Sequence, residues 1–278
     1  MQPVTLISGA TAGMGRRTAL LLARRGHRVF AGARHEDAAG QLRQAAAADG
    51  LEIATVPLDV TDRASVDQAV QNVLEQAGRI DNLVNNAGFG LLATVEEGSD
   101  QEFIRQFDVN VFGVLRLCRA VLPAMRIQGS GVIVNISSFL GRMGLPLLSH
   151  YNASKYAVEG ITDSLRHEVR PFGIRVHSIL PGLFGTDFVR RGLVASQATL
   201  AEDSPYAALV AKLVPVVSEK INQGPDPIAV AEAVARVIED PQAPIRLPVG
   251  VEAETFVPLT RQLSDEDFEA KVREVFGL

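Results

Sequence analysis

Short apolar runs alternate with longer amphipathic segments from the first residues to about residue 180. The short runs are typical of strands buried on both faces, and the longer segments have helical spacing, with Thr61 and Ser99 as expected N-caps. This alternation predicts a single-domain, Rossmann-type α/β fold: a doubly wound parallel sheet of about seven strands, with right-handed crossovers and helices on both faces. The expected strands are 4–7, 28–33, 52–57, 82–84, 131–136, 174–180 and 245–249, and the expected helices lie near 14–25, 36–49, 62–77, 100–128, 150–171 and 227–239.

The chain shows no internal division into domains. No linker rich in proline, glycine or serine and no repeat occurs in its 278 residues, so we expect one domain over residues 1–278. Residues 186–225 interrupt the alternation, because two apolar pieces near 186–195 and 204–221 come without a strand of their own. Long excursions at the carboxyl edge of such a sheet are typical of lids or binding loops, and an extra pair of packing helices explains the pattern equally well.

Composition and charge exclude several classes of protein. With 27 basic and 32 acidic residues, the chain has a net charge of −5 and no basic block, so no nucleic-acid partner is predicted. The single cysteine, Cys118, excludes an internal disulfide and fits a reducing compartment. Neither a signal sequence nor an apolar run near the roughly 18 residues of a membrane span is found. Because the five histidines lack ligand spacing, we expect no metal site, and we expect a cytoplasmic protein without a membrane partner.

A glycine-rich turn follows the first predicted strand and opens the first predicted helix. It reads Ser8-Gly9-Ala10-Thr11-Ala12-Gly13-Met14-Gly15. Glycine permits a tight turn and close approach of the backbone to a pyrophosphate, whose charge meets the N–H groups of the helix N-terminus. The spacing G-x-x-x-G-x-G differs from the standard dinucleotide fingerprint, and alone it is weak evidence. Its position in a βαβ unit nevertheless predicts a nucleotide site.

Tyr151 and Lys155 lie four residues apart at the start of a predicted helix, so their side chains share one face. A free phenol has a pKa of about 10 and is a poor base at neutral pH. A nearby ammonium is expected to lower that pKa by roughly 1–3 units. Tyr151 can then accept a proton from an alcohol or donate one to a carbonyl. The same spacing also occurs on many solvated helices, so the pair alone does not establish catalysis.

Two further polar residues fall at informative positions. Ser138 ends the buried strand 131–136 at the carboxyl edge, where open α/β sheets bind their ligands. Its hydroxyl can hold a substrate oxygen and stabilise developing charge. Ser137 is adjacent and chemically equal, and physical reasoning does not separate the two. Asn110 lies in an otherwise apolar stretch, where it is either a satisfied core amide or a site residue.

These motifs occur together in the order that resembles the short-chain dehydrogenase/reductase family, whose first motif is T-G-x-x-x-G-[IL]-G. Ser8 replaces the threonine of that motif, and Met14 replaces the isoleucine or leucine. The stretch 141–160 is most similar to the hydroxysteroid and retinol dehydrogenase branch. The other matching residues are Asp59, the run Asn85-Asn86-Ala87-Gly88, Asn110, Ser138, Tyr151, Lys155, and Pro181-Gly182 with Thr186.

The resemblance implies an oxidoreductase that interconverts an alcohol and a ketone or aldehyde. It implies that Tyr151 is the acid/base. It implies that Ser138 rather than Ser137 is the site serine, because Ser138 lies thirteen residues before Tyr151. It also implies that Asn110 holds a water that links Lys155 to solvent as a proton relay. The implied catalytic residues are Asn110, Ser138, Tyr151 and Lys155. The implied cofactor-binding residues are Gly9, Thr11, Ala12, Gly13, Met14, Gly15, Arg34, Asp59, Val60, Asn86, Ala87, Gly88, Tyr151, Lys155, Pro181, Gly182 and Thr186.

Arg34 follows the second predicted strand and bears on the choice between NADP and NAD. An NAD-specific site places an aspartate or glutamate there for the ribose 2′-hydroxyl. An arginine makes forked bonds to a phosphate instead, so NADP is the predicted cofactor. NAD remains the alternative, because Ala12 stands where many NADP-using relatives have a basic residue, and Glu36 or Asp37 could serve NAD if the strand ended later.

Residues 183–225 directly follow Pro181 and Gly182, so we expect them to form a mobile lid over a mainly apolar pocket. The partner is then a small alcohol or carbonyl substrate of apolar character. A rigid subdomain that contacts a second copy is the alternative. The family resemblance implies a homodimer or homotetramer formed through the helices near 100–128 and 150–171.

Two other functional classes fit parts of the pattern. A non-catalytic dinucleotide-binding sensor or scaffold has the same fold, but such relatives usually lack the tyrosine or the lysine. A sugar-nucleotide epimerase or dehydratase also uses Tyr-x-x-x-Lys, but it resembles a longer architecture with a G-x-x-G-x-x-G turn. The retained tetrad and the shorter chain favour the dehydrogenase interpretation.

Overall fold

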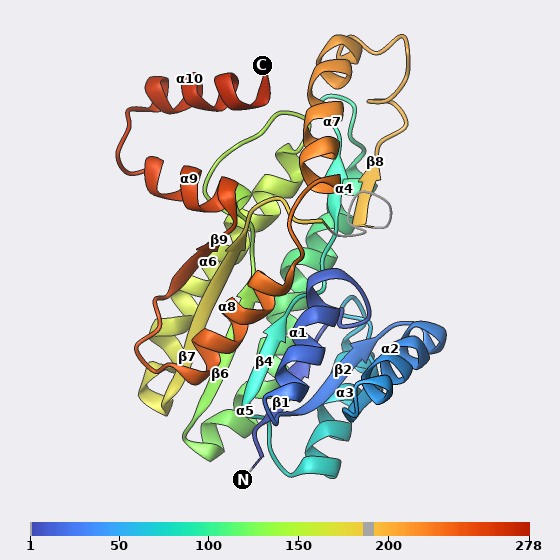
Figure 1. The fold of residues 1–278 in the computed structure, drawn as a ribbon, viewed down its shortest axis with the longest axis vertical. Coiled ribbons are helices and arrows are strands. Elements are labelled where there is room, and N and C mark those ends of the chain that lie inside the picture. The colour runs from blue at the N-terminus through green and yellow to red at the C-terminus, as the bar shows by residue number, and fades with distance from the viewer. Residues whose placement is uncertain (1, 186–191) are drawn as a thin grey trace.

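A seven-stranded parallel sheet forms the centre of the computed structural model, which describes residues 2–185 and 192–278. The strand order is β3-β2-β1-β4-β6-β7-β9 (Figure 1), so the chain winds outward from β1 in one direction and then from β4 in the other. This is the doubly wound sheet that the sequence predicts. The strands are β1 (Val4–Ile7), β2 (Arg28–Ala33), β3 (Ile53–Pro57), β4 (Asn82–Asn85), β6 (Gly131–Ile136), β7 (Ile174–Pro181) and β9 (Arg246–Val249).

Helices cover both faces of the sheet, each through its own apolar cluster. Helices α1, α2 and α8 pack on one face, and α3, α5 and α6 pack on the other (Figure 1). Cys118 is buried in the second cluster. No helix in the described part of the chain is both long and apolar enough to cross a membrane. The bounds are α1 (Gly13–Arg24), α2 (Glu36–Ala48), α3 (Arg63–Ala77), α5 (Gly113–Gln128), α6 (Ser149–Val169) and α8 (Ile228–Glu239).

The single helix expected over residues 100–128 is interrupted. Helix α4 (Asp100–Phe107) passes into a π-helical turn over Asp108–Phe112 before α5 begins. Such turns insert one residue into an α-helix and occur often at functional sites. Here the turn carries the buried Asn110. Because the apolar spacing continues across the insertion, the periodicity alone did not reveal it.

One of the two predicted N-caps is correct. Ser99 caps α4, and Glu102 completes a capping box with it. The prediction of Thr61 for α3 is wrong: Asp62 caps that helix by accepting a hydrogen bond from the N–H of Ala64, at 2.9 Å. Thr61 instead donates its N–H and its hydroxyl to Asp59, at 2.9 and 2.7 Å. Thr61 therefore holds the turn after β3 through Asp59, and the cap of α3 is left to Asp62.

A cap covers the carboxyl ends of the central strands, at the end of the molecule opposite the N-terminus (Figure 1). The expectation that this excursion lacks a strand is wrong, because β8 (Leu193–Ala195) pairs in parallel with β5 (Gly90–Leu92). Three residues are too few for a recognisable period, and the partner strand is remote in sequence. The other elements of the cap are α7 (Ala207–Asn222), α9 (Val251–Leu259) and α10 (Asp265–Phe276), which share an apolar cluster with residues 139–148.

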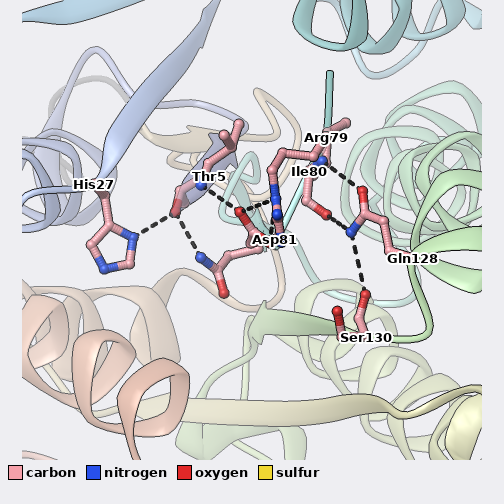
Figure 2. A network of polar contacts seen from close by, with 9 residues as sticks. Thr5, His27, Arg79, Ile80, Asp81, Gln128 and Ser130 are labelled. Carbon is pink, nitrogen blue, oxygen red and sulfur yellow. Dashed lines mark hydrogen bonds and ion pairs between the residues drawn. The ribbon is translucent and has the colours of Figure 1, made fainter. Parts of the chain in front are cut away.

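The opposite, amino-terminal edge of the sheet is held by a polar network (Figure 2). The Asp81 carboxylate accepts a hydrogen bond from the Val4 N–H at 2.7 Å and pairs with Arg79. The Thr5 hydroxyl accepts a hydrogen bond from Asn82 and lies 2.9 Å from Nδ1 of the buried His27. These bonds join β1, β2 and β4 far from the carboxyl edge, and so they stabilise the sheet without entering the candidate site.

Candidate active site

A cavity of about 910 Å³ opens at the carboxyl edge of the sheet. It begins at the glycine turn after β1, passes the ends of β2 and β3, and continues beneath α7. Parallel open sheets bind their ligands at this edge. The predicted cofactor residues that line it are Gly9, Thr11, Ala12, Gly13, Met14, Arg34, Asp59, Val60, Asn86, Ala87, Gly88, Tyr151, Lys155, Pro181 and Gly182.

One of the described cofactor residues that the sequence predicts, Gly15, is not in this lining. Gly15 lies behind the turn, where a Cβ would stand 2.4 Å from the Gly9 carbonyl oxygen and 2.4 Å from Nδ2 of Asn86. Its missing side chain therefore lets α1 close against the turn. Thr186 lies outside the described residues.

The glycine turn is clamped to the segment after β4. Gly9 has a φ of +62°, and a Cβ on it would lie 2.9 Å from Cα of Ala87. Asn86 donates from Nδ2 to the carbonyls of Ser8 and Gly9, at 3.1 and 2.9 Å. The Ser8 hydroxyl accepts from the N–H groups of Asn86 and Ala87, at 3.0 and 3.1 Å. A hydroxyl at this position thus performs the clamping even though serine replaces the threonine of the motif.

A carboxylate and an arginine flank the next part of the cavity. Burial by itself raises the pKa of Asp59, but the two hydrogen bonds from Thr61 and the nearby Arg34 and Arg116 outweigh it and hold that pKa below its usual value. Asp59 is therefore an ionised hydrogen-bond acceptor at neutral pH. Arg34 is exposed at the cavity rim, whereas Glu36 pairs with Arg43 on α2.

Helix α6 and the end of β6 bring the predicted catalytic side chains together. The Ser138 hydroxyl hydrogen-bonds to the Tyr151 phenol and accepts from the N–H of Leu140, at 3.1 Å. Nζ of Lys155 lies 5.6 Å from the centre of the Tyr151 ring and donates to the Ile136 carbonyl at 2.9 Å. The buried Ser137 hydroxyl has no hydrogen-bond partner among the described residues. The two adjacent serines, which physical reasoning from the sequence left equal, thus differ in their hydrogen bonding.

The electrostatics of this pair differ from the expectation. Burial raises the pKa of Tyr151 to about 12, and the bond to Ser138 opposes that rise only in part. Burial also lowers the pKa of Lys155 to about 8, against the opposing charge of Glu159. The predicted lowering of the tyrosine pKa is therefore wrong for the ligand-free protein, because burial disfavours the charged phenolate. The Tyr151 phenol is therefore neutral at pH 7.

Asn110 lies behind the loop after β4 rather than in the cavity lining. Its Oδ1 accepts from the N–H of Phe89 at 3.0 Å, and its Nδ2 donates to the Phe89 carbonyl and to Ser154, at 2.9 and 3.1 Å. A Cβ on Gly88 would stand 3.2 Å from Oδ1 of Asn110 and 3.7 Å from Nζ of Lys155. The Asn110 side chain is thus a satisfied amide that fixes the loop beside Lys155.

The sequence did not identify the residues before α6 as part of the site. Leu147 is buried, lines the cavity and has a φ of +64°, which is rare for a residue other than glycine. Its carbonyl accepts from the N–H of Ala93 at 2.8 Å, so the strained residue ties this segment to the loop after β5. Nothing in a run of leucines signals such a conformation. The other apolar residues at this end of the cavity are Leu92, Leu140, Pro146, Leu148, Leu183, Leu193, Val194, Leu213, Val214 and Val217.

Comparison with known proteins agrees with this geometry. Residues 3–193 match the short chain dehydrogenase family. The chain is 36% identical to a 3-ketodihydrosphingosine reductase of Bacteroides thetaiotaomicron over 252 residues, which are 90% of this chain and 89% of that protein. A short-chain dehydrogenase from Streptomyces avermitilis superimposes with a TM-score of 0.83 at 36% identity, covering 99% of this chain and 96% of its own.

A short-chain dehydrogenase/reductase from Burkholderia phymatum, solved in complex with NAD, has a TM-score of 0.80 at 27% identity and covers 97% of this chain and 95% of its own. The family match over residues 3–193 and the 36% identity to a relative covered over 89% of its length both show the family of this chain. The chain therefore belongs to the short-chain dehydrogenase family, whose members are oxidoreductases acting on CH–OH and C=O groups.

Proposed function

We propose that this protein is an NADP-dependent oxidoreductase that interconverts an alcohol and a ketone or aldehyde on an apolar substrate. The observation that carries the proposal is the meeting of Ser138, Tyr151 and Lys155 in one cavity that also follows the glycine turn. Carbonyl reduction needs a proton donor, a hydroxyl that hydrogen-bonds the carbonyl oxygen and a nearby cation, all beside a cleft that can hold a dinucleotide.

The chain's own residues supply the proton chemistry. In the reductive direction, Tyr151 donates its phenolic proton to the carbonyl oxygen, and Ser138 holds that oxygen by a hydrogen bond. The positive charge of Lys155 stabilises the phenolate that remains. A bound nicotinamide cofactor supplies the hydride transfer. The high pKa of Tyr151 in the ligand-free protein suits this direction, because the donor is fully protonated at pH 7.

The cavity suits a dinucleotide at several points. Gly9 approaches Ala87 so closely that no side chain fits there, so the backbone of the glycine turn stays accessible. A pyrophosphate that binds at a helix N-terminus requires such access to the backbone N–H groups. The ionised Asp59 lies farther along the cleft, as an acceptor for the adenine end. Arg34 and His35 line the rim at the end of β2, and neither Glu36 nor Asp37 does, which supports NADP over NAD.

The end of the cavity next to Tyr151 supports an apolar substrate. Leu140 and Leu147 line it on one side, and Leu213, Val214 and Val217 from α7 line it on the other. Burying an apolar group against such walls contributes roughly 25 cal/mol per Å². We propose that residues 183–225 act as a lid over this end, with α7 as the wall that contacts substrate.

A homodimer formed through α5 and α6 belongs to the same proposal. The exposed apolar side chains on these helices and on the π-helical turn before α5 include Phe112, Leu115 and Tyr156, with Phe112 47% exposed and Tyr156 48% exposed. Contact between two copies would cover them. A molar mass near 29.8 kDa by light scattering, at micromolar concentration, would contradict this part of the proposal.

Tyr151→Phe tests the reaction. The change keeps the ring and removes the proton, so kcat should fall by about 10²–10⁴-fold while the Kd for NADPH changes little. Turnover of a panel of ketones, aldehydes and alcohols is followed by the absorbance of reduced nicotinamide. Wild-type activity of the variant on every substrate would refute the proton-transfer role. A wild-type protein that binds NADPH without any turnover would favour the sensor interpretation.

A further inference from the structure

A buried ionic cluster lies beneath the catalytic helix. Glu159 on α6 is 3% exposed, accepts a hydrogen bond from Nε of Arg246 at 2.5 Å, and accepts another from the Ser178 hydroxyl. Arg246 belongs to β9 and also pairs with Asp163, at 2.6 Å. Ser178 belongs to β7, so the carboxylate joins α6 to two strands of the sheet. Burying an ion pair of this kind gives little net stability compared with apolar residues of similar volume, so stability does not account for it.

The cluster touches both elements that carry the reacting groups. Glu159 follows Lys155 by one helical turn on the same face of α6. Gly141, in the turn that carries Ser138, packs directly on this face. A Cβ there would lie 3.2 Å from Cγ of Glu159, 3.1 Å from the Lys155 carbonyl and 2.8 Å from Oγ of Ser137. The stem of Glu159 therefore forms part of the floor on which the Ser138 turn rests.

The charge of Glu159 also reaches the site. Lys155 is 7% exposed, and burial disfavours its positive form. Among the described residues, the Tyr151 ring on α6 and the Ile136 carbonyl on β6 are neutral neighbours of its ammonium. Glu159 is the charged group that acts on Lys155, and it favours the ammonium.

We propose that Glu159, held by Arg246 and Ser178, is a positioning residue that supports the Ser138 turn and places a fixed negative charge one helical turn behind Lys155. The inference rests on the proposed function for the role of Lys155 in catalysis, but its structural content can be tested without turnover. A substitution that keeps the shape and removes the charge separates this role from packing alone.

The lysines of this chain make a direct measurement feasible. Only Lys155, Lys212, Lys220 and Lys271 occur in the sequence, so protein labelled with 13C at lysine Cε gives four signals, and Lys155→Arg assigns the one of interest. In Glu159→Gln the titration midpoint of Lys155 should fall by about 0.5–1 pH unit. This is below the roughly 1–3 units of a contact pair, because Arg246 neutralises much of the carboxylate charge. Asp163→Asn is the matched control, since it removes a carboxylate from Arg246 and leaves Glu159 in place, and no shift is expected.

A second variant covers the case in which Glu159→Gln does not fold because Arg246 is left unpaired. Glu159→Gln with Arg246→Met removes both charges together, and the Lys155 midpoint should fall in the same direction. A midpoint within 0.2 unit of the wild type, in whichever of the two variants folds, would overturn the proposal.

The pH dependence of catalytic activity provides an independent test. Carbonyl reduction needs Lys155 in its charged form, so the alkaline limb of the kcat/KM profile should move to lower pH in Glu159→Gln and stay in place in Asp163→Asn. A shifted Lys155 midpoint in a protein that reduces no carbonyl would refute the proposed function while leaving the role of Glu159 intact. A shifted midpoint with an unmoved profile would refute the link between Glu159 and catalysis.

Discussion

The left-handed conformation of Gly9 predicts a large effect for a single added methyl group. In Gly9→Ala the alanine must adopt a φ of +62°. Its Cβ would lie 2.9 Å from Cα of Ala87 and 3.1 Å from the backbone nitrogen of Ala87. Both atoms belong to backbone, which cannot rotate away as a flexible side chain does. Gly50 offers a matched control, because it has a φ of +69° and an added Cβ would meet nothing within 4 Å.

The two variants separate strain from collision. A left-handed alanine costs about 1–2 kcal/mol, which is the whole effect expected for Gly50→Ala. Gly9→Ala adds the cost of overpacking, about 1–3 kcal/mol. An unfolding entropy of about 2.1 cal/mol/K per residue, over 278 residues, is about 0.6 kcal/mol/K. The Tm of Gly9→Ala should therefore lie about 2–5 °C below that of Gly50→Ala.

Circular dichroism measures both Tm values, since the chain has no tryptophan for fluorescence. Titration with NADPH measures the second consequence. Displacing Ala87 opens the clamp between the glycine turn and the segment after β4, so Gly9→Ala should lose affinity at least tenfold while Gly50→Ala binds like the wild type. Equal Tm values together with equal Kd values for the two variants would refute the assignment of this contact as the clamp of the nucleotide site.

Three further outcomes follow from particular residues. Arg34→Ala should lower kcat/KM for NADPH by about tenfold and leave kcat/KM for NADH nearly unchanged, because an exposed charged hydrogen bond contributes about 1.5 kcal/mol. A preference for NAD that survives the change would refute the NADP assignment. Burial lowers the pKa of His27 below 6.5, so the contribution of His27 to the free energy of unfolding is present above that pH and is lost as the pH falls. Urea titrations from pH 8 to 5 should therefore show a steeper loss of stability toward acid for the wild type than for His27→Asn, and parallel curves would contradict this. Hydrogen exchange over residues 192–225 should be fast without ligands and slow with cofactor and substrate, whereas strong protection in both states would favour a rigid subdomain over a lid.

The sequence by itself determined the features that depend on local chemistry. The alternation of buried runs and amphipathic segments specifies the parallel sheet. The spacing of apolar residues in each segment indicates whether one face or both faces of that strand or helix are buried. The glycine turn at residues 9–15 and the spacing of Tyr151 and Lys155 likewise depend on neighbours within a few positions. These predictions required no knowledge of distant contacts, and the parallel, doubly wound sheet of seven strands that follows from them is confirmed.

Tertiary structure decided what depends on distant groups. The pairing of β5 with β8, the contact of Ser138 with Tyr151 and the cluster of Glu159 with Arg246 each join segments that no local period connects. The direction of the Tyr151 pKa belongs to the same class, because burial raises that pKa by more than the hydrogen bond to Ser138 lowers it. Desolvation is a property of everything packed around a side chain, and only the folded chain determines which residues those are.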